Sequence, residues 1–282
     1  MGQTIACANQ KGGVGKTTTV VNLATYLALA GERVLVIDLD PQGNATSGFG
    51  IERPLVEQSI YGAMIGSAQL SELIVTTPVE GLDLIPASLA LAGAEVELAG
   101  LMARERRLAT SLDAIGDEHD FVLIDCPPSL GLLTINALTA ASSVLIPIQC
   151  EYYALEGLSQ LTATINLVRD HLNPDLAIKG VVLTMFDART NLATEVAAEV
   201  RRHLGSTVYK TVIPRSVRLS EAPSHGLPIA LYRPESKGAE AYRELAAEFL
   251  RRERRSAPAE PSGALALAGA VAVAAGMAGA DR

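Results

Sequence analysis

The chain has 282 residues, of which 49% are hydrophobic and 19% charged, and its formal net charge is −8. This composition is typical of a soluble globular protein, and the length allows a substantial core in one α/β domain, which we expect to span residues 1–255. The three cysteines form no C-x-x-C pair, which excludes a disulfide framework and a zinc site and favours buried thiols. They are Cys7, Cys126 and Cys150.

Charge is unevenly distributed along the chain. Residues 1–159 carry 7 basic and 18 acidic side chains, a balance of −11, whereas residues 160–255 carry 15 and 11, a balance of +4. Because salt confines each patch to roughly 10 Å, the basic half can present a face that attracts phosphate, although scattered solvated arginines explain the balance equally well. The start of the chain lacks the regions of a signal peptide, so we expect a cytoplasmic protein.

The first predicted elements are a buried strand at residues 4–8, a glycine-rich turn, and a helix at residues 17–29. Glycines let successive backbone N–H groups converge on phosphate oxygens, and the helix N-terminus adds a favourable dipole. The spacing therefore predicts a phosphate-binding loop for ATP, in which Lys16 reaches the β- and γ-phosphates and the Thr17 hydroxyl helps hold Mg²⁺. The predicted nucleotide-binding residues of the loop are Lys11, Gly12, Gly13, Val14, Gly15, Lys16, Thr17 and Thr18.

This loop departs from the usual G-x-x-x-x-G-K-[ST] spacing. Gln10 stands where the first glycine is expected, and a second lysine, Lys11, begins the loop. In this respect the sequence resembles the deviant Walker ATPases. The resemblance implies that Lys11 crosses a dimer interface to the partner's nucleotide and that Gly12 lies at this interface.

A second apolar strand, at residues 33–38, ends in a pair of acidic residues, Asp38 and Asp40. Parallel α/β sheets place ligand chemistry at the carboxyl ends of their strands. We therefore expect Asp40 to position or deprotonate the attacking water and Asp38 to lie near the metal. A surface turn is the alternative for residues 40–44.

The middle of the chain carries no assigned chemistry. We expect a loop at residues 46–50, a short helix at 59–65, a strand at 82–86 and a helix over 87–115. The next apolar strand, at residues 121–125, ends in Asp125, a Walker B pattern that predicts a ligand for a water of the Mg²⁺ shell. The proline-rich turn that follows, at residues 126–131, is the candidate conformational switch.

Later elements alternate between strands and helices. We expect strands at residues 143–147 and 178–185, helices ending at 171 and spanning 192–204, an extended segment at 211–218, a turn at 219–226, and an amphipathic helix at 238–255. The four histidines lack metal-ligand spacing and are interpreted as surface or cap residues. The loops after the late strands lie on the nucleotide side of the sheet, where they can bracket a base.

Motifs along most of the chain resemble the chromosomal ParA/Soj partition ATPases. The resemblance implies a doubly wound, mostly parallel sheet flanked by helices, an ADP-bound monomer, and an ATP-bound homodimer that binds DNA of the nucleoid without sequence preference. A ParB/Spo0J-type partner then stimulates slow hydrolysis and releases the protein. The motifs lie at residues 9–18, 38–46, 121–131, 150–157, 184–191 and 212–226.

The resemblance also assigns residues in the basic half. Arg189 and Arg218 match arginines used for DNA contact, and phosphate contact suits their net-basic surroundings. Pro214 and Ser216 match residues that help hold adenine. The family more often has asparagine at the Ser216 position, so base contact there is expected to be altered.

Two other classes of protein share parts of this pattern. A MinD-like membrane regulator of cell division needs a terminal amphipathic helix with basic residues. Here residues 256–282 form an Ala/Gly-rich segment, which we expect to be a disordered low-complexity tail rather than a membrane anchor. An iron–sulfur reductase of the nitrogenase iron-protein type needs cluster-ligating cysteines at a dimer axis, a setting that Cys126 and Cys150 lack.

Overall fold

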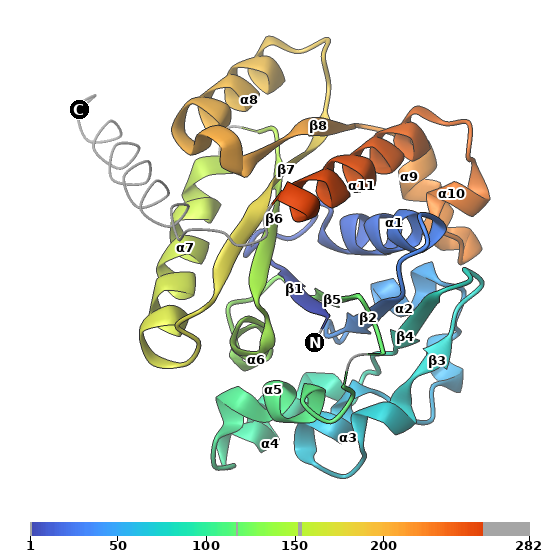
Figure 1. Cartoon of the computed structure of the whole chain (residues 1–282), viewed down its shortest axis with the longest axis vertical. Helices are drawn as coiled ribbons and strands as arrows, with labels where there is room; N and C mark the ends of the chain where they lie inside the picture. Colours follow the sequence, from blue (N-terminus) through green and yellow to red (C-terminus); the bar gives the residue numbers. More distant parts are fainter. Residues whose placement is uncertain (1, 117, 152–153, 256–282) are drawn as a thin grey trace.

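The computed structural model describes residues 2–116, 118–151 and 154–255. Eight strands form one sheet in the order β3-β4-β2-β5-β1-β6-β7-β8 (Figure 1). All neighbouring strands run parallel except β3 and β4. The strands are β1 (Gln3–Cys7), β2 (Val34–Asp38), β3 (Val75–Thr76), β4 (Leu82–Ile85), β5 (Phe121–Asp125), β6 (Ser143–Gln149), β7 (Ala177–Phe186) and β8 (Val208–Pro214).

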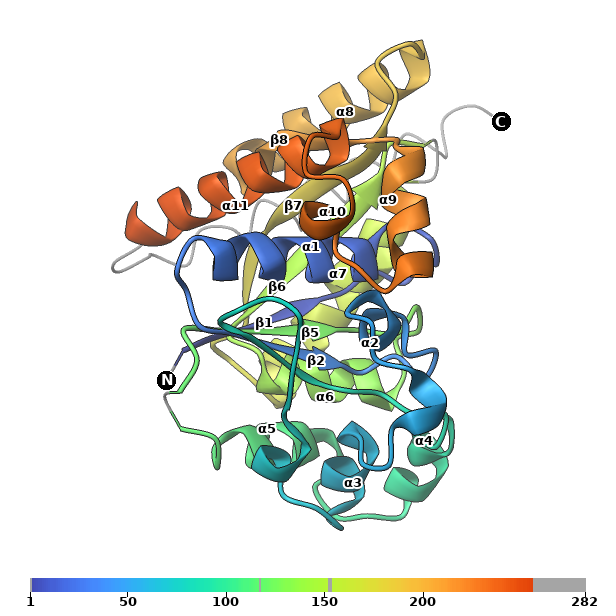
Figure 2. The same cartoon turned by 90° about the vertical axis from the view of Figure 1, so that its right-hand side faces the viewer.

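Helices cover both faces of this sheet (Figure 2). One apolar core lies between the sheet and α1, α10 and α11, and the other between the sheet and α3 to α8. Successive residues of β1 alternate between the two cores, with Ile5 and Cys7 in one and Ala6 in the other, as the period of two requires. The helices are α1 (Lys16–Leu29), α2 (Asn44–Gly48), α3 (Ile60–Ile65), α4 (Leu91–Ala99), α5 (Arg107–Leu112), α6 (Leu132–Ala140), α7 (Ala154–His171), α8 (Asn191–Leu204), α9 (Val217–Glu221), α10 (Ile229–Tyr232) and α11 (Lys237–Arg255).

This architecture confirms the predicted doubly wound, mostly parallel sheet. The strands that read as unbroken apolar runs, β2 and β5, are buried on both faces along their whole length. Helices on both sides of a parallel sheet explain why these strands show no polar alternation. The predicted strands and the last helix agree with the structure to within a few residues at each end.

Three local predictions were wrong. The helix expected over residues 87–115 is broken into α4, a 3₁₀ turn at Arg104–Arg106 and α5, and Ala103 before this turn adopts a left-handed φ of 50°. The loop expected at 46–50 is largely the short helix α2, whose N-terminus is bound by a buried carboxylate. The segment at 217–226 is helical, as α9 and a 3₁₀ turn, instead of extended and turn.

The buried polar residues include one of the four histidines that were interpreted from the sequence as surface or cap residues. His119 is 8% exposed, and its Nε2 lies 3.1 Å from a carboxylate oxygen of Asp83. The three cysteines are free and buried, as predicted. Within the described part of the chain, no helix combines the length and apolarity needed to cross a bilayer. The predicted tail, residues 256–282, lies outside the described residues.

Candidate nucleotide site

The glycine-rich turn joins the central strand β1 to the N-terminus of α1. Gly13 and Gly15 adopt φ values of 73° and 87°, in the left-handed region that glycine enters without steric penalty. The carbonyl of Gly15 accepts the first hydrogen bond of α1, from the N–H of Thr19, at 2.9 Å. The turn therefore opens at the N-terminus of a 14-residue helix, the geometry that binds phosphate groups.

Neighbouring strands fasten this loop from both ends. The Asn9 side chain donates to the carbonyl of Pro147 in β6 at 2.7 Å and accepts from the Lys11 N–H at 3.0 Å. The Thr184 hydroxyl in β7 donates to the carbonyl of Val14 at 2.8 Å. Asn9 and Thr184 were not predicted as site residues, although each stands at or just beyond the carboxyl end of an apolar strand, where such side chains are expected.

The two lysines of the loop point to different places. Lys16 is buried, and its Nζ lies 3.4 Å from the carbonyl oxygen of Lys11, inside the curve of the loop. Lys11 instead places its Nζ 3.1 Å from a carboxylate oxygen of Glu151, beyond the end of β6. In this structure only Lys16 is directed into its own phosphate loop.

Two aspartates end adjacent strands beside the loop. Asp38 of β2 and Asp125 of β5 are register partners, and both are fully buried. Neither carboxylate oxygen of Asp125 has a hydrogen-bond partner among the described residues. Burial and the nearby Asp38 raise the pKa of Asp125 well above its usual value; the Thr17 hydroxyl is near enough to oppose this rise without meeting hydrogen-bond geometry. A buried carboxylate whose oxygens receive no hydrogen bond from the protein is suited to bind a cation.

Asp38 is engaged differently from Asp125. One of its oxygens accepts hydrogen bonds from both the backbone N–H and the hydroxyl of Thr46, at 2.7 Å each, and so holds the start of α2. Burial raises the pKa of Asp38 to about 6, against the lowering effect of these hydrogen bonds. Asp38 therefore has less free capacity for a metal shell than Asp125.

Asp40 follows β2 at the mouth of the site. It is 7% exposed, and its Oδ1 accepts from the N–H of Gln42 at 2.9 Å. A second turn hydrogen bond joins the N–H of Gly43 to the carbonyl of Asp40 at 2.8 Å. The turn given as the alternative for this segment is thus present, and it fixes a carboxylate at the carboxyl edge of the sheet.

The donors at this edge fit Mg²⁺ held together with phosphate. Among the described residues, no group of three or more His, Cys, Asp or Glu side chains is arranged to hold a metal alone. Mg²⁺ prefers one or two carboxylates, water and substrate phosphates to such a cage. Asp125 with its free oxygens and Thr17 at the start of α1 supply a donor set of this kind.

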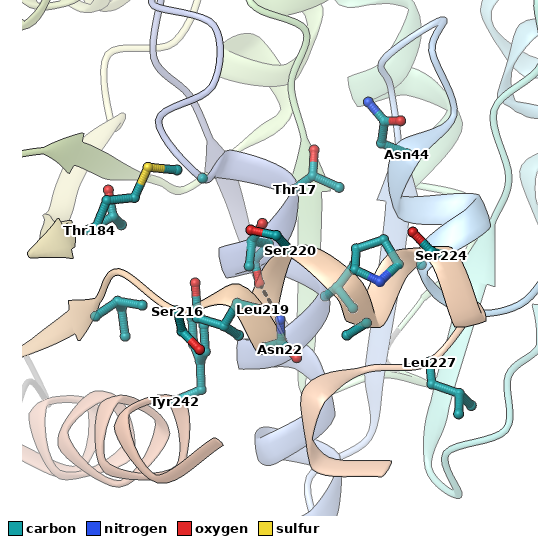
Figure 3. Close-up of a pocket in the computed structure, with 18 of the residues that line it drawn as sticks. Thr17, Asn22, Asn44, Thr184, Ser216, Leu219, Ser220, Ser224, Leu227 and Tyr242 are labelled. Atoms are coloured by element: carbon teal, nitrogen blue, oxygen red, sulfur yellow. Dashed lines mark hydrogen bonds between the residues drawn. The ribbon is translucent and has the colours of Figure 1, made fainter. Parts of the chain in front are cut away.

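A cavity of about 540 Å³ opens beside the phosphate loop, across the N-terminal half of α1. Figure 3 shows Thr17 and Asn22 of α1 at its floor, Thr184 and Ser216 on one side, and Asn44 and Ser224 on the other. Its volume is within the range of small-molecule sites. Further lining residues include Met185, Ile213, Pro214, Leu219, Pro223 and Tyr242.

One wall of the cavity contains Pro214 and Ser216, the two residues expected to contact the adenine base. It also contains Met185, a non-glycine residue with a left-handed φ of 51°. Such strained residues gather at binding sites. Neither Met185 nor Tyr242 of α11 was predicted here, because backbone strain and the packing of α11 over the pocket leave no signal in the sequence.

The two arginines expected at DNA lie on separate elements after the late strands. Arg189 precedes α8, is 86% exposed, and forms two hydrogen bonds to Asp187, at 2.9 and 2.7 Å. These bonds lower the pKa of Asp187 to about 2. Arg218 of α9 lies 2.7 Å from a carboxylate oxygen of Glu221. Both guanidinium groups are therefore at the surface and paired with acidic neighbours.

Comparisons with known proteins agree with this geometry. A protein-family model described as an AAA domain matches residues 2–178. The chain is 62% identical over 248 residues to the sporulation initiation inhibitor protein Soj of Bacillus subtilis, covering 88% of this chain and 98% of that protein. It is 53% identical to the chromosome partitioning protein ParA of Myxococcus xanthus, covering 92% of this chain and 91% of that protein.

The fold is also found among solved structures. A crystal structure described as cobyrinic acid a,c-diamide synthase from Mycobacterium smegmatis, with bound ADP and magnesium, superposes with a TM-score of 0.80 at 39% identity, covering 93% of this chain and 98% of that one. Identity to the Soj protein is higher, at 62% over 248 residues. The chain therefore belongs to the Soj/ParA family of chromosome-partitioning ATPases.

Proposed function

We propose that this protein is an ATP-dependent, dimerising ATPase that partitions chromosomal or plasmid DNA. The observation that carries the proposal is the phosphate loop with two lysines, set beside a nucleotide-sized cavity and an unpartnered buried aspartate, Asp125. The similarity to Soj and ParA proteins over about nine-tenths of the chain supports the same conclusion.

In this proposal the cavity holds ATP. The loop residues Lys11 to Thr18 surround the phosphates, with Lys16 compensating their charge from within, and Pro214 and Ser216 contact the base. Thr17, Asp125 and, with less free capacity, Asp38 hold Mg²⁺ and its waters. The ion neutralises charge on the phosphates when it is bound. Asp40 orients the attacking water and accepts its proton, for which its fixed position at the mouth of the site is suited.

Dimerisation and DNA binding complete the proposed cycle. Lys11 of each subunit reaches the nucleotide of the other, with Gly12 at the interface; a Cβ added at Gly12 would have no atom nearer than 3.9 Å within the subunit, so this position is open on its outer side. Arg189 and Arg218 contact DNA phosphates in the ATP-bound dimer, on the nucleoid in the cytoplasm. A ParB/Spo0J-type partner stimulates hydrolysis, and the turn at residues 126–131 serves as the switch.

A MinD-like membrane function has less support. That function requires a terminal amphipathic helix, and the segment in question lies outside the described residues. The relatives at 62% and 53% identity are Soj and ParA proteins. DNA partition therefore remains the better-supported function.

Binding to random-sequence duplex DNA tests the proposal. The full chain is measured with ATP, with ADP and without nucleotide across a salt series, and Lys16→Ala serves as the variant that cannot hold phosphate. We expect strong binding with ATP alone, which falls steeply with salt because counterions are released at each phosphate contact. Binding that is equal in all three states, or retained by Lys16→Ala with ATP, would contradict the proposal.

A further inference from the structure

Glu151 joins three segments at the carboxyl edge of the sheet. It lies two residues beyond β6, and its Oε2 is 3.1 Å from the Nζ of Lys11. Its Oε1 accepts a hydrogen bond from the Gln149 side chain at 2.5 Å and lies 3.8 Å from a guanidinium nitrogen of Arg215. Lys11 belongs to the phosphate loop and Arg215 to the cavity wall, so one carboxylate contacts both parts of the site.

The backbone directs Lys11 toward this carboxylate. The hydrogen bonds of Asn9 to Pro147 and to the Lys11 N–H fix the start of the loop against β6. The Lys11 side chain therefore leaves the loop beside the end of β6, where Glu151 stands. The pair joins residues 140 positions apart in sequence, so it depends on the tertiary fold.

The contact and the proposed function make opposite demands on Lys11. A lysine that completes the site of a second subunit must extend away from its own subunit, whereas here its ammonium group is neutralised within the subunit. Resting on the proposed function, we infer that Glu151 is a positioning residue that holds Lys11 in the monomer and so raises the ATP-dimer dissociation constant. Formation of each dimer breaks two Lys11–Glu151 pairs.

The strength of the pair suits a reversible restraint. The side chains of Lys11 and Glu151 are 39% and 44% exposed, and ion pairs this open to water are weak. The several negative charges of a nucleoside triphosphate can therefore compete with Glu151 for the ammonium group of Lys11. Arg215 already lies near the same carboxylate, so Glu151 keeps a cationic neighbour after Lys11 departs.

The test compares Glu151→Gln with Glu80→Gln. Glu80 is exposed just before β4, at the amino end of that strand and so away from the carboxyl edge where Glu151 lies. Its substitution makes the same change in net charge. Dimer dissociation constants are measured by sedimentation of the full chain with a non-hydrolysable ATP analogue. We expect Glu151→Gln to tighten the dimer about 2- to 30-fold, from two exposed ion pairs per dimer. Glu80→Gln should match the wild type.

Two further measurements separate this role from a merely structural one. The affinity of the monomer for ADP should be the same in Glu151→Gln and the wild type, and Glu151→Asp should restore much of the restraint. Lys11→Ala by itself should weaken the dimer, and in that background Glu151→Gln should leave the dissociation constant unchanged, because the restrained group is absent.

The outcomes distinguish the two proposals. A wild-type protein that stays monomeric with the ATP analogue would overturn the proposed function itself. A wild-type protein that dimerises, with Glu151→Gln dimerising equally or more weakly, would overturn the restraint and leave the proposed function standing. Tightening that persists in the Lys11→Ala background would also overturn it, since the effect would not act through Lys11.

Discussion

Glu248 of α11 is a buried carboxylate that fastens β8, the last strand of the sheet. Its oxygens accept hydrogen bonds from the backbone N–H groups of Lys210 and Thr211 and from the Thr211 hydroxyl, each at 2.9 Å. Arg252, one turn further along α11, lies 2.8 Å from the same carboxylate. The carboxylate thus supplies acceptors to an edge strand whose register with β7 is irregular.

Glu248→Gln would keep the shape of this side chain, remove its charge and replace one of its two acceptor oxygens by an NH2 group, which cannot accept a hydrogen bond. A hydrogen bond to a charged group contributes about 1.5–3 kcal/mol, and one between neutral groups about 0.5–1.5 kcal/mol. One backbone hydrogen bond then becomes neutral and the other is lost, so we expect the free energy of unfolding to fall by about 2.5–4.5 kcal/mol. In a chain of this size that lowers Tm by about 5–18 °C.

Thermal and urea unfolding measure this loss. Glu244→Gln is the matched control, because Glu244 is exposed one turn earlier on the same helix and its substitution changes the net charge equally. The control should stay within about 0.5 kcal/mol of the wild type. If both variants were equally stable, the carboxylate would not be what holds β8, and the reasoning would fail.

The pH dependence of the stability is a second, independent test of the role of Glu248. Burial opposes ionisation of Glu248, but the hydrogen bonds prevail and lower its pKa below the usual 4.5. A lowered folded-state pKa contributes stability that is fully present above the unfolded-state pKa and is lost as the pH falls through the folded-state value. The stability gap between wild type and Glu248→Gln should therefore be constant near neutral pH and narrow below about pH 4.5. A gap that widened in acid would contradict the assignment.

Three further predictions concern the site. Asp40→Ala should bind ATP but turn it over at least tenfold more slowly, so that ATP-dependent DNA complexes persist in a time course; normal turnover would remove Asp40 from the water role. Arg189→Ala or Arg218→Ala should weaken DNA binding and flatten the slope of log affinity against log salt by about 0.9 per lost phosphate contact, and an unchanged slope would exclude that residue. Thr46→Val should lower the free energy of unfolding by about 2–4 kcal/mol in urea titrations, since the buried hydroxyl donates to Asp38 and accepts from a backbone N–H; Thr46→Ser should retain most of the stability, and equal losses would implicate packing instead.

Much of the fold and of the candidate site could be predicted from short stretches of sequence. The phosphate loop requires left-handed backbone at Gly13 and Gly15, and its lysine and threonine follow at a fixed spacing. Asp38 and Asp125 each end an apolar run, and parallel strands bring such ends to one edge of the sheet. The features that identify these segments lie within a few consecutive residues. The sequence alone therefore indicated both the sheet and the chemistry at its carboxyl edge.

Other features depended on contacts between distant residues. The short helix α2 forms where Asp38 accepts from the backbone N–H of Thr46, and the region predicted as one helix breaks after α4, where Ala103 takes a left-handed conformation. His119, which precedes β5, is buried where Asp83 of β4 offers it a partner. Turn propensities and the spacing of apolar residues do not reveal partners that are distant in the sequence.

The phosphate loop and the aspartates that end β2 and β5 could thus be predicted from the sequence itself, because backbone conformation and strand burial are encoded within each motif. The present direction of Lys11 was decided only by the tertiary structure. Its partner Glu151 lies 140 residues away and is reached because β1 and β6 are adjacent in the sheet. The pairing of α11 with β8 through Glu248 likewise arises only when the last helix packs across the sheet, since hydrogen bonds and ion pairs depend on distance in space and leave no periodic trace along the chain.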